Sequence, residues 1–207
     1  NMNASFMAKP FSDEAGNGMH VHLSVVDKDG NNVFTMDKNK QPQGLFSHAI
    51  GGLLKTTPDF LSFYAPHSNS YRRLVHNGDH APTTLSWGNE NRTALIRLPE
   101  ASAEATRLEF RVASADSNPY LVFASVLASV YAGIQGKLQH DKETIGNAHA
   151  QHPPSLGVTW REAVEKTSVS SLVKDFFGEQ FQQCYTCVKE SEIKRFESTI
   201  TDFEYHS

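Results

Sequence analysis

Hydrophobic and polar positions alternate with a period of two in several short segments, and each of these segments is predicted to be a strand. The clearest is residues 18–27, in which one side carries Val21, Leu23 and Val25 and the other carries His20, His22 and Ser24. This is the pattern of a half-buried strand. Residues 3–9, 92–98 and 105–112 are predicted to be strands as well. The turn residues 29–32 predict a hairpin whose return strand begins at Val33.

A different period, with apolar residues three and four positions apart, predicts the helices. It begins at Phe46, and Pro58 is expected to end that helix before a second short one over residues 60–64. Asn118 is expected to cap, and Pro119 to open, a long apolar helix that runs to about residue 138. Shorter helices are predicted over residues 160–166 and 172–177, and a last one from about residue 179 to the end of the chain.

Residues 65–91 show neither period, and a segment of this length without regular structure is expected to be functional. The strands carry the polar residues, and most of the helices follow them in the chain. This order predicts the α+β fold class.

Composition limits the classes of function that this chain could have. The 207 residues are 39% hydrophobic and 20% charged, with a formal net charge of −4, which is typical of an ordinary globular protein. A slightly acidic balance disfavours a nucleic-acid partner, and the longest apolar run is too short to span a membrane. The two cysteines, Cys184 and Cys187, lack further metal ligands nearby and are expected to be structural or surface thiols in a reducing cytoplasm.

The strand predicted over residues 105–112 has the most chemically informative face, because Arg107, Glu109 and Arg111 share it. These charges could simply pair with one another on a solvated face. The alternative is a site in which Glu109 holds a divalent cation and the arginines bind anions, since hard cations prefer carboxylate oxygens and guanidinium groups suit phosphate or carboxylate.

Other predicted strands add to this second interpretation. His20 and His22 share one face, and a histidine with carboxylates suits Mg²⁺ or Mn²⁺, although two such histidines are also common as ordinary core or surface groups. Arg92 and Arg97 are an odd interval apart, so one of them must lie outside the regular strand or beside a bulge. Together these residues indicate a site for a polyanionic substrate and a metal ion.

Several motifs, in order and at about the expected spacing, resemble those of the glutamine synthetase family. They are FMAKPF followed by GNGMHVHLS (residues 6–24), NSYRRLV (69–75), SWGNENRTALIRLP (86–99), RLEFR (107–111), NPYL (118–121) and ITDFE (200–204). The resemblance implies the C-terminal part of a glutamine synthetase catalytic domain over residues 1–207. It also implies a curved antiparallel sheet that bears the active site and is backed by helices. The implied activity is an ATP-dependent ligase that joins ammonia or a primary amine to the γ-carboxylate of glutamate through γ-glutamyl phosphate.

The resemblance also implies roles for individual residues. His20 and Glu109 would bind Mg²⁺ or Mn²⁺, and Arg92 would contact the γ-phosphate of ATP. The implied nucleotide contacts are His22, Ser24, Arg97 and Arg107. The implied glutamate contacts are Gly16, Arg73 and Arg111. Asp79 and His80 lie in the loop that would contact the acceptor amine.

Three departures from the family pattern bear on these roles. Ammonia-using members carry a glutamate just before the Ala-Pro pair, where this chain has His80 in a loop one residue longer. Glu104 stands where a lysine is expected, and Ala15 where an asparagine is usual. The motifs NSYRRL and SWGNENRT are more similar to the γ-glutamyl-polyamine branches, which leaves the acceptor amine open.

The resemblance further implies a homo-oligomeric ring. It also implies that this chain lacks the small N-terminal β-grasp domain and the strands bearing the other metal-binding glutamates, all of which would precede Asn3. Two other interpretations are a non-catalytic structural or sensory relative, which Glu104 and His80 would suit, and a guanidino kinase, whose sheet and arginines are similar but against which the GNGMHVH segment argues.

Overall fold

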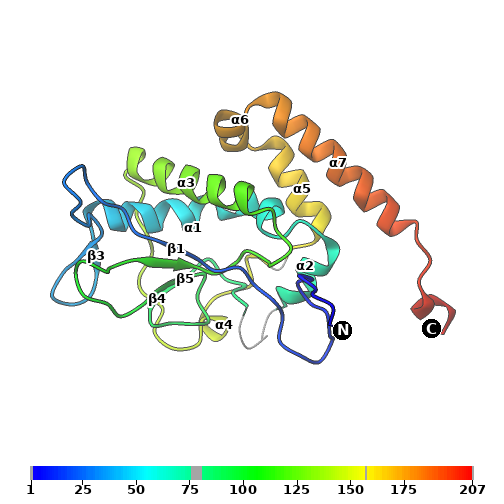
Figure 1. Cartoon of the computed structure of the whole chain (residues 1–207), viewed down its shortest axis with the longest axis horizontal. Coiled ribbons are helices and arrows are strands. Elements are labelled where there is room, and N and C mark those ends of the chain that lie inside the picture. Colours follow the sequence, from blue (N-terminus) through cyan, green and yellow to red (C-terminus); the bar gives the residue numbers. More distant parts are fainter. Residues whose placement is uncertain (1, 76–80, 157, 207) are drawn as a thin grey trace.

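Small sheets pack beneath two long helices, and three further helices extend from one end (Figure 1). The computed structural model describes residues 2–75, 81–156 and 158–206. The strands are β1 (Val21–Leu23), β2 (Thr35–Met36), β3 (Pro42–Gln43), β4 (Trp87–Asn89), β5 (Ile96–Leu98) and β6 (Leu108–Phe110). The helices are α1 (Gly44–Tyr64), α2 (Ser68–Arg73), α3 (Pro119–Gln135), α4 (Ala148–Gln151), α5 (Trp160–Val169), α6 (Ser171–Phe177), α7 (Glu179–Glu197) and the 3₁₀-helix η1 (Asp202–Tyr205). The α+β class is confirmed.

The main sheet is open and has the strand order β1-β6-β5-β4. β1 pairs with β6 in antiparallel register, with His22 opposite Glu109, and β5 pairs with β6 with Arg97 opposite the same glutamate. Directly opposed residues point to the same face of a sheet. The register therefore places a carboxylate between an imidazole and a guanidinium on one face; strand parity predicted the polar faces that carry His22 and Glu109 but did not assign Arg97 to them.

One strand pair contradicts the expectation of an antiparallel sheet, because β4 and β5 are parallel. Parallel neighbours normally need a crossover of about a dozen or more residues, yet only residues 90–95 join these two strands. The short loop is anchored from outside, since the Asn91 side chain donates hydrogen bonds to the carbonyls of Thr144 and Gly146 at 2.7 and 2.8 Å. These distant contacts let the chain loop outward and return in its original direction.

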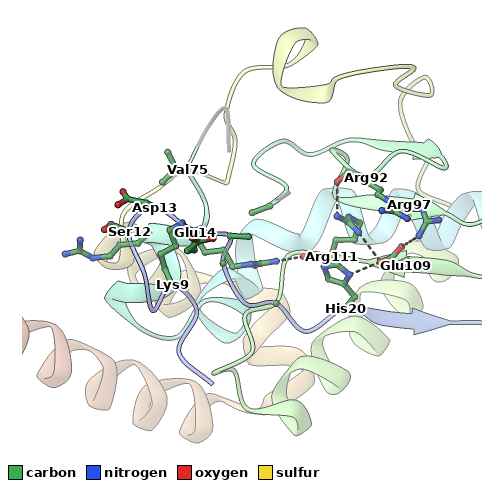
Figure 2. A pocket seen from close by; sticks show the side chains of 16 residues that line it. Lys9, Ser12, Asp13, Glu14, His20, Val75, Arg92, Arg97, Glu109 and Arg111 are labelled. Atoms are coloured by element: carbon green, nitrogen blue, oxygen red, sulfur yellow. Dashed lines mark hydrogen bonds and ion pairs between the residues drawn. The ribbon is translucent and has the colours of Figure 1, made fainter. Parts of the chain in front are cut away.

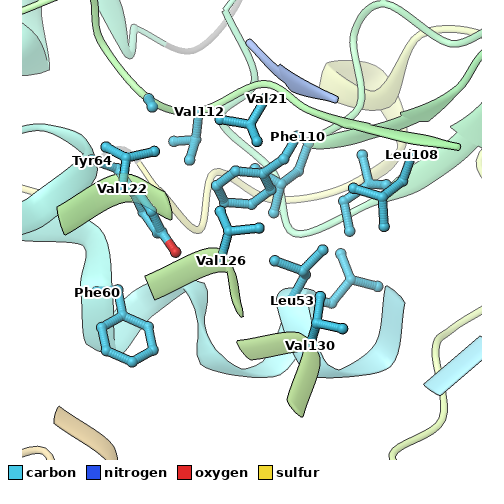
Figure 3. Close-up of a cluster of buried hydrophobic side chains, with 14 of the residues drawn as sticks. Val21, Leu53, Phe60, Tyr64, Leu108, Phe110, Val112, Val122, Val126 and Val130 are labelled. Carbon is cyan, nitrogen blue, oxygen red and sulfur yellow. The ribbon is translucent and has the colours of Figure 1, made fainter. Parts of the chain in front are cut away.

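The opposite, apolar face of the sheet packs against α1 and α3 to form the core. In Figure 3, Val21 and Phe110 from the sheet meet Leu53 from α1 and Val126 from α3. Phe110 is fully buried and makes an edge-on ring contact with Tyr64, with 5.0 Å between the ring centroids. The core thus fixes one face of β6, and the other face is left for polar side chains.

The prediction that Pro58 ends the first helix is wrong, because α1 continues through it to Tyr64. A proline inside a helix removes one backbone hydrogen bond and disfavours helix by about 3 kcal/mol. Here Phe60, Leu61 and Phe63 beyond the proline are buried in the core. Their packing outweighs the local penalty and joins the two predicted helices into one.

The remaining helices mostly follow their sequence signals. The Asn118 side chain accepts a hydrogen bond from the backbone of Tyr120 and caps α3, as predicted, although the helix ends at Gln135. Helices α5 and α6 are confirmed, whereas α7 stops at Glu197 instead of running to the end of the chain. Cys184 and Cys187 on α7 are free and exposed. No helix among the described residues is long and apolar enough to cross a membrane.

Several local predictions need correction. Residues 3–9 form no strand, and the predicted strands over 18–27, 92–98 and 105–112 shorten to the three-residue β1, β5 and β6. The return strand after the 29–32 turn is reduced to an isolated bridge between Val26 and Asn32. The segment 65–91 contains α2 and β4. Short elements of this kind carry too few residues to show a period, so tertiary contacts decide them.

The crossing of α1 and α3 depends on a close approach between two glycines. A Cβ added at Gly133 would lie 2.2 Å from the carbonyl oxygen of His48 and 2.7 Å from Cα of Gly52. We expect Gly133→Ala to lower the free energy of unfolding by about 1–3 kcal/mol or more, because the helices must separate. Urea unfolding followed by circular dichroism measures this. Gly136→Ala is the control, since its nearest contact is 3.1 Å away, and equal losses in both variants would contradict the prediction.

Candidate functional site

A cleft of about 930 Å³ opens at the polar face of the sheet (Figure 2). Its charged lining comprises the cations Lys9, Arg72, Arg73, Arg92, Arg97 and Arg111 and the carboxylates Asp13, Glu14 and Glu109. The chain as a whole carries a formal net charge of −4, yet cations outnumber carboxylates here by two to one. Such a surface attracts polyanions.

Glu109 on β6 is the centre of the cleft's polar network and is only 3% exposed. Its Oε1 accepts from Nδ1 of His20 at 2.8 Å and from Nη1 of Arg111 at 3.0 Å. Its Oε2 accepts from Nη1 of Arg97 at 2.8 Å. Figure 2 shows these groups converging at one end of the cleft. The convergence predicted from strand parity is confirmed for His20, Glu109 and Arg111, whereas His22 and Arg107 lie outside the cleft.

The charges around Glu109 set its protonation and that of His20. Burial alone would raise the pKa of the Glu109 carboxyl, but the Arg97 hydrogen bond and the charge of Arg111 hold that pKa below its ordinary value. Burial, followed by the positive charge of Arg111, lowers the pKa of His20. The pair therefore consists of a carboxylate and a neutral imidazole at pH 7. A carboxylate can only accept, so Nδ1 of His20 carries the proton and Nε2 keeps a lone pair.

Arg73 crosses beneath the glycine-rich segment and supports the cleft. Its Nη1 and Nη2 donate to the carbonyls of Val112 and Arg111 at 2.8 and 3.1 Å. Burial, followed by the charge of Arg111, lowers the pKa of Arg73 to about 10, so the group remains a cation at neutral pH. A Cβ at Gly18 would lie 2.5 Å from Arg73 Nη2, and one at Gly16 would lie 2.8 Å from Arg73 Cγ. The two glycines are needed because the arginine passes so close to the backbone.

The predicted site residues divide into three groups. Those that line the cleft are Gly16, His20, Arg73, Arg92, Arg97, Glu109 and Arg111. His22 and Arg107 lie outside it and contact each other, with Nε of the arginine 3.3 Å from Nδ1 of the histidine, while Ser24 is exposed. Asp79 and His80 lie outside the described residues. Arg92 precedes β5 whereas Arg97 lies within it, as their odd spacing required.

Some cleft residues were not predicted. Lys9, Ser12, Asp13 and Glu14 form the end of the cleft farther from Glu109, as Figure 2 shows. Arg72 also lines the cleft. Lys9 lies within the FMAKPF motif and Arg72 lies within the NSYRRLV motif, so these motifs could have identified both residues. Segment 12–14 has no periodic pattern, so only the folded arrangement places it here.

The donor groups near Glu109 suit a magnesium-like ion that keeps most of its other ligands as water and phosphate. Such an ion is commonly held by one or two carboxylates together with substrate phosphates. Glu109 supplies one carboxylate, and Nε2 of His20 supplies a neutral nitrogen. Among the residues that the structure describes, no three His, Cys, Asp or Glu side chains come together as a metal site. These residues would therefore hold a cation only with further ligands.

Comparison with known proteins is consistent with this geometry. The profile of the family described as glutamine synthetase, catalytic domain, matches residues 1–207. Gamma-glutamylputrescine synthetase of Escherichia coli is 35% identical over 98% of this chain and 43% of its own length. Gamma-glutamylethanolamide synthetase of Streptomyces coelicolor is 34% identical over the same shares, and glutamine synthetase of Thermotoga maritima is 35% identical over 97% of this chain and 47% of its own. The chain spans less than half the length of these relatives.

Proposed function

This chain belongs to the glutamine synthetase catalytic-domain family, and from that premise we propose that it forms the C-terminal part of the catalytic domain of an ATP-dependent glutamate–amine ligase. The observation that carries the proposal is the convergence of Glu109, His20 and several arginines in one cleft on the polar face of the sheet. The family match rules out the alternative interpretation of the chain as a guanidino kinase. We further propose that the full-length protein is a cytoplasmic homo-oligomeric ring.

The reaction explains why arginines are needed. A carboxylate is a poor electrophile, so the γ-carboxylate of glutamate first attacks the γ-phosphorus of ATP, and ADP leaves. The amine then attacks the carbonyl carbon of the γ-glutamyl phosphate, phosphate leaves, and the nitrogen loses a proton. Negative charge develops on phosphoryl oxygens in the first step. Fixed cations directed at those oxygens lower its barrier.

The cleft residues can be assigned to these steps. Arg92 is exposed in the cleft, and we assign it to the γ-phosphate. Gly16, Arg73 and Arg111 would form the glutamate site, in which Arg73 also supports the backbone of residues 111 and 112.

A second set of residues would bind the nucleotide and the cation. Arg97, together with the His22–Arg107 pair and Ser24, would contact the nucleotide. Glu109 and His20 would hold Mg²⁺ or Mn²⁺, which supplies charge neutralisation at the phosphates.

We expect the full-length protein to prefer a primary amine over ammonium, because His80 lacks the fixed negative charge that would attract NH₄⁺. Two of the relatives above are named for putrescine and ethanolamide products. The measurement is glutamate-dependent ADP release with ammonium, methylamine and putrescine. A higher kcat/KM for ammonium would overturn the acceptor assignment, and no ADP release with any amine would favour the non-catalytic relative instead.

A further inference from the structure

Glu90, to which no role has been assigned so far, occupies an unusual position beside the cleft. It follows β4 and has a φ of 51°, in the left-handed region that residues other than glycine seldom adopt. Its backbone nitrogen donates to the carbonyl of Leu98 at 3.0 Å, which fixes this turn against β5. Its carboxylate accepts from the backbone nitrogen of Glu100 and from Nη2 of Arg97. The turn thus places a carboxylate next to an arginine of the cleft.

Arg97 is consequently divided between two carboxylates. Its Nη2 donates to Oε2 of Glu90 at 2.6 Å, and its Nη1 donates to Oε2 of Glu109 at 2.8 Å. Hydrogen bonds between a guanidinium and a carboxylate are charge-assisted and strong, and both terminal nitrogens of one guanidinium can donate to the same carboxylate. Without Glu90, the Nη2 group of Arg97 would be free to turn towards Oε2 of Glu109 and donate a second hydrogen bond to that oxygen.

Because Arg97 donates to both Glu90 and Glu109, one acceptor position on Glu109 is left unoccupied. A carboxylate offers about four lone-pair positions. Oε1 of Glu109 already accepts from His20 and Arg111, whereas Oε2 accepts from Arg97. These three hydrogen bonds leave one position on Oε2 for another partner. A parallel bidentate pair would need Oε1, which already accepts two hydrogen bonds, so a second hydrogen bond from Nη2 of Arg97 would take the free position on Oε2 instead.

We propose that Glu90 is a positioning residue that holds Nη2 of Arg97 away from Glu109 and so keeps Oε2 of Glu109 accessible to the divalent cation. The inference rests on the proposed function, because it takes Glu109 as a cation ligand. A purely structural role is the alternative. Glu90 is 49% exposed on its side chain, and an exposed ion pair of that kind contributes little to stability and would not affect cation binding.

The first test is Mn²⁺ binding by the full-length protein, measured by calorimetric titration without substrates. We expect Glu90→Gln to weaken Mn²⁺ binding by about tenfold, the size of effect seen when an outer partner of a metal ligand is lost, with little change in Tm. Glu100→Gln is the matched control, because it removes the same charge from an exposed pair with Lys40 whose side chains do not touch Arg97. Equal binding by the two variants would overturn the proposal.

A second test separates positioning from the simple loss of a nearby negative charge. If Glu90 acts through Arg97, adding Glu90→Gln to an Arg97→Gln protein will weaken Mn²⁺ binding no further, because the competing guanidinium has gone. A through-space charge effect would persist in that background and would overturn the proposal. If the wild type is active and Glu90→Gln binds Mn²⁺ with the same affinity as the wild type, this inference alone is contradicted. A wild type that binds no Mn²⁺ contradicts the proposed function as well.

Discussion

Glu109→Gln is expected to reduce the turnover of the full-length protein by at least about 100-fold, the usual cost of removing one group that stabilises charge in the transition state. The amide keeps the size of the carboxylate but loses its charge and one acceptor oxygen. His20 and a cation would lose their anionic partner. Arg97 and Arg111, which both donate to this carboxylate, would then face each other across a neutral group.

The same substitution should also destabilise the fold, because removing one partner of a buried ion pair costs about 3–5 kcal/mol. Turnover must therefore be measured below the unfolding transition, with Tm recorded for each variant. Glu143→Gln is a suitable control. Glu143 is a partly buried glutamate outside the cleft that accepts hydrogen bonds from Asn89 and Gln41, so its loss should lower stability and spare turnover. Turnover of Glu109→Gln within about tenfold of wild type would remove Glu109 from the mechanism.

Much of this site could be predicted from local geometry. The alternation around Glu109 and around His22 assigns each side chain to one face of its strand, and these two residues prove to be directly opposed. Apolar neighbours such as Val21 and Phe110 fix which face is buried. Parity therefore predicted that the polar residues converge, although it could not predict which atoms of Arg97 and Glu109 would meet.

The features that sequence could not predict depend on contacts between distant segments. The parallel pairing of β4 and β5 depends on Asn91 reaching the backbone near residue 144, which no local pattern encodes. The passage of α1 through Pro58 depends on core packing. Glu90 was missed for a related reason, because its importance comes from a positive φ and from a carboxylate shared with an arginine seven positions later.

A fragment consisting only of residues 1–207 is expected to fold but to show no ligase turnover. Phosphoryl transfer depends almost wholly on positioning and charge neutralisation by metal ions and cations. The described residues would contribute one carboxylate and one histidine to the proposed cation site, and no third acidic, histidine or cysteine ligand joins them. Each absent contact of this kind costs about 100-fold or more in rate. The relatives are more than twice as long as the matched segment, and we propose that the remaining ligands come from the corresponding upstream region.

The measurement is glutamate-dependent ADP release by the purified 207-residue chain with ATP, Mg²⁺ or Mn²⁺ and excess putrescine. Circular dichroism and a cooperative urea transition would first establish that the chain is folded, so that inactivity cannot be attributed to unfolding. The full-length protein under the same conditions is the positive control. Because the proposed upstream ligands would all be missing together, their losses would multiply and the signal should not exceed the glutamate-free background. Turnover by the chain alone near the roughly 10 s⁻¹ typical of enzymes would show that residues 1–207 hold a complete cation site and that Glu109 and His20 are not its only ligands.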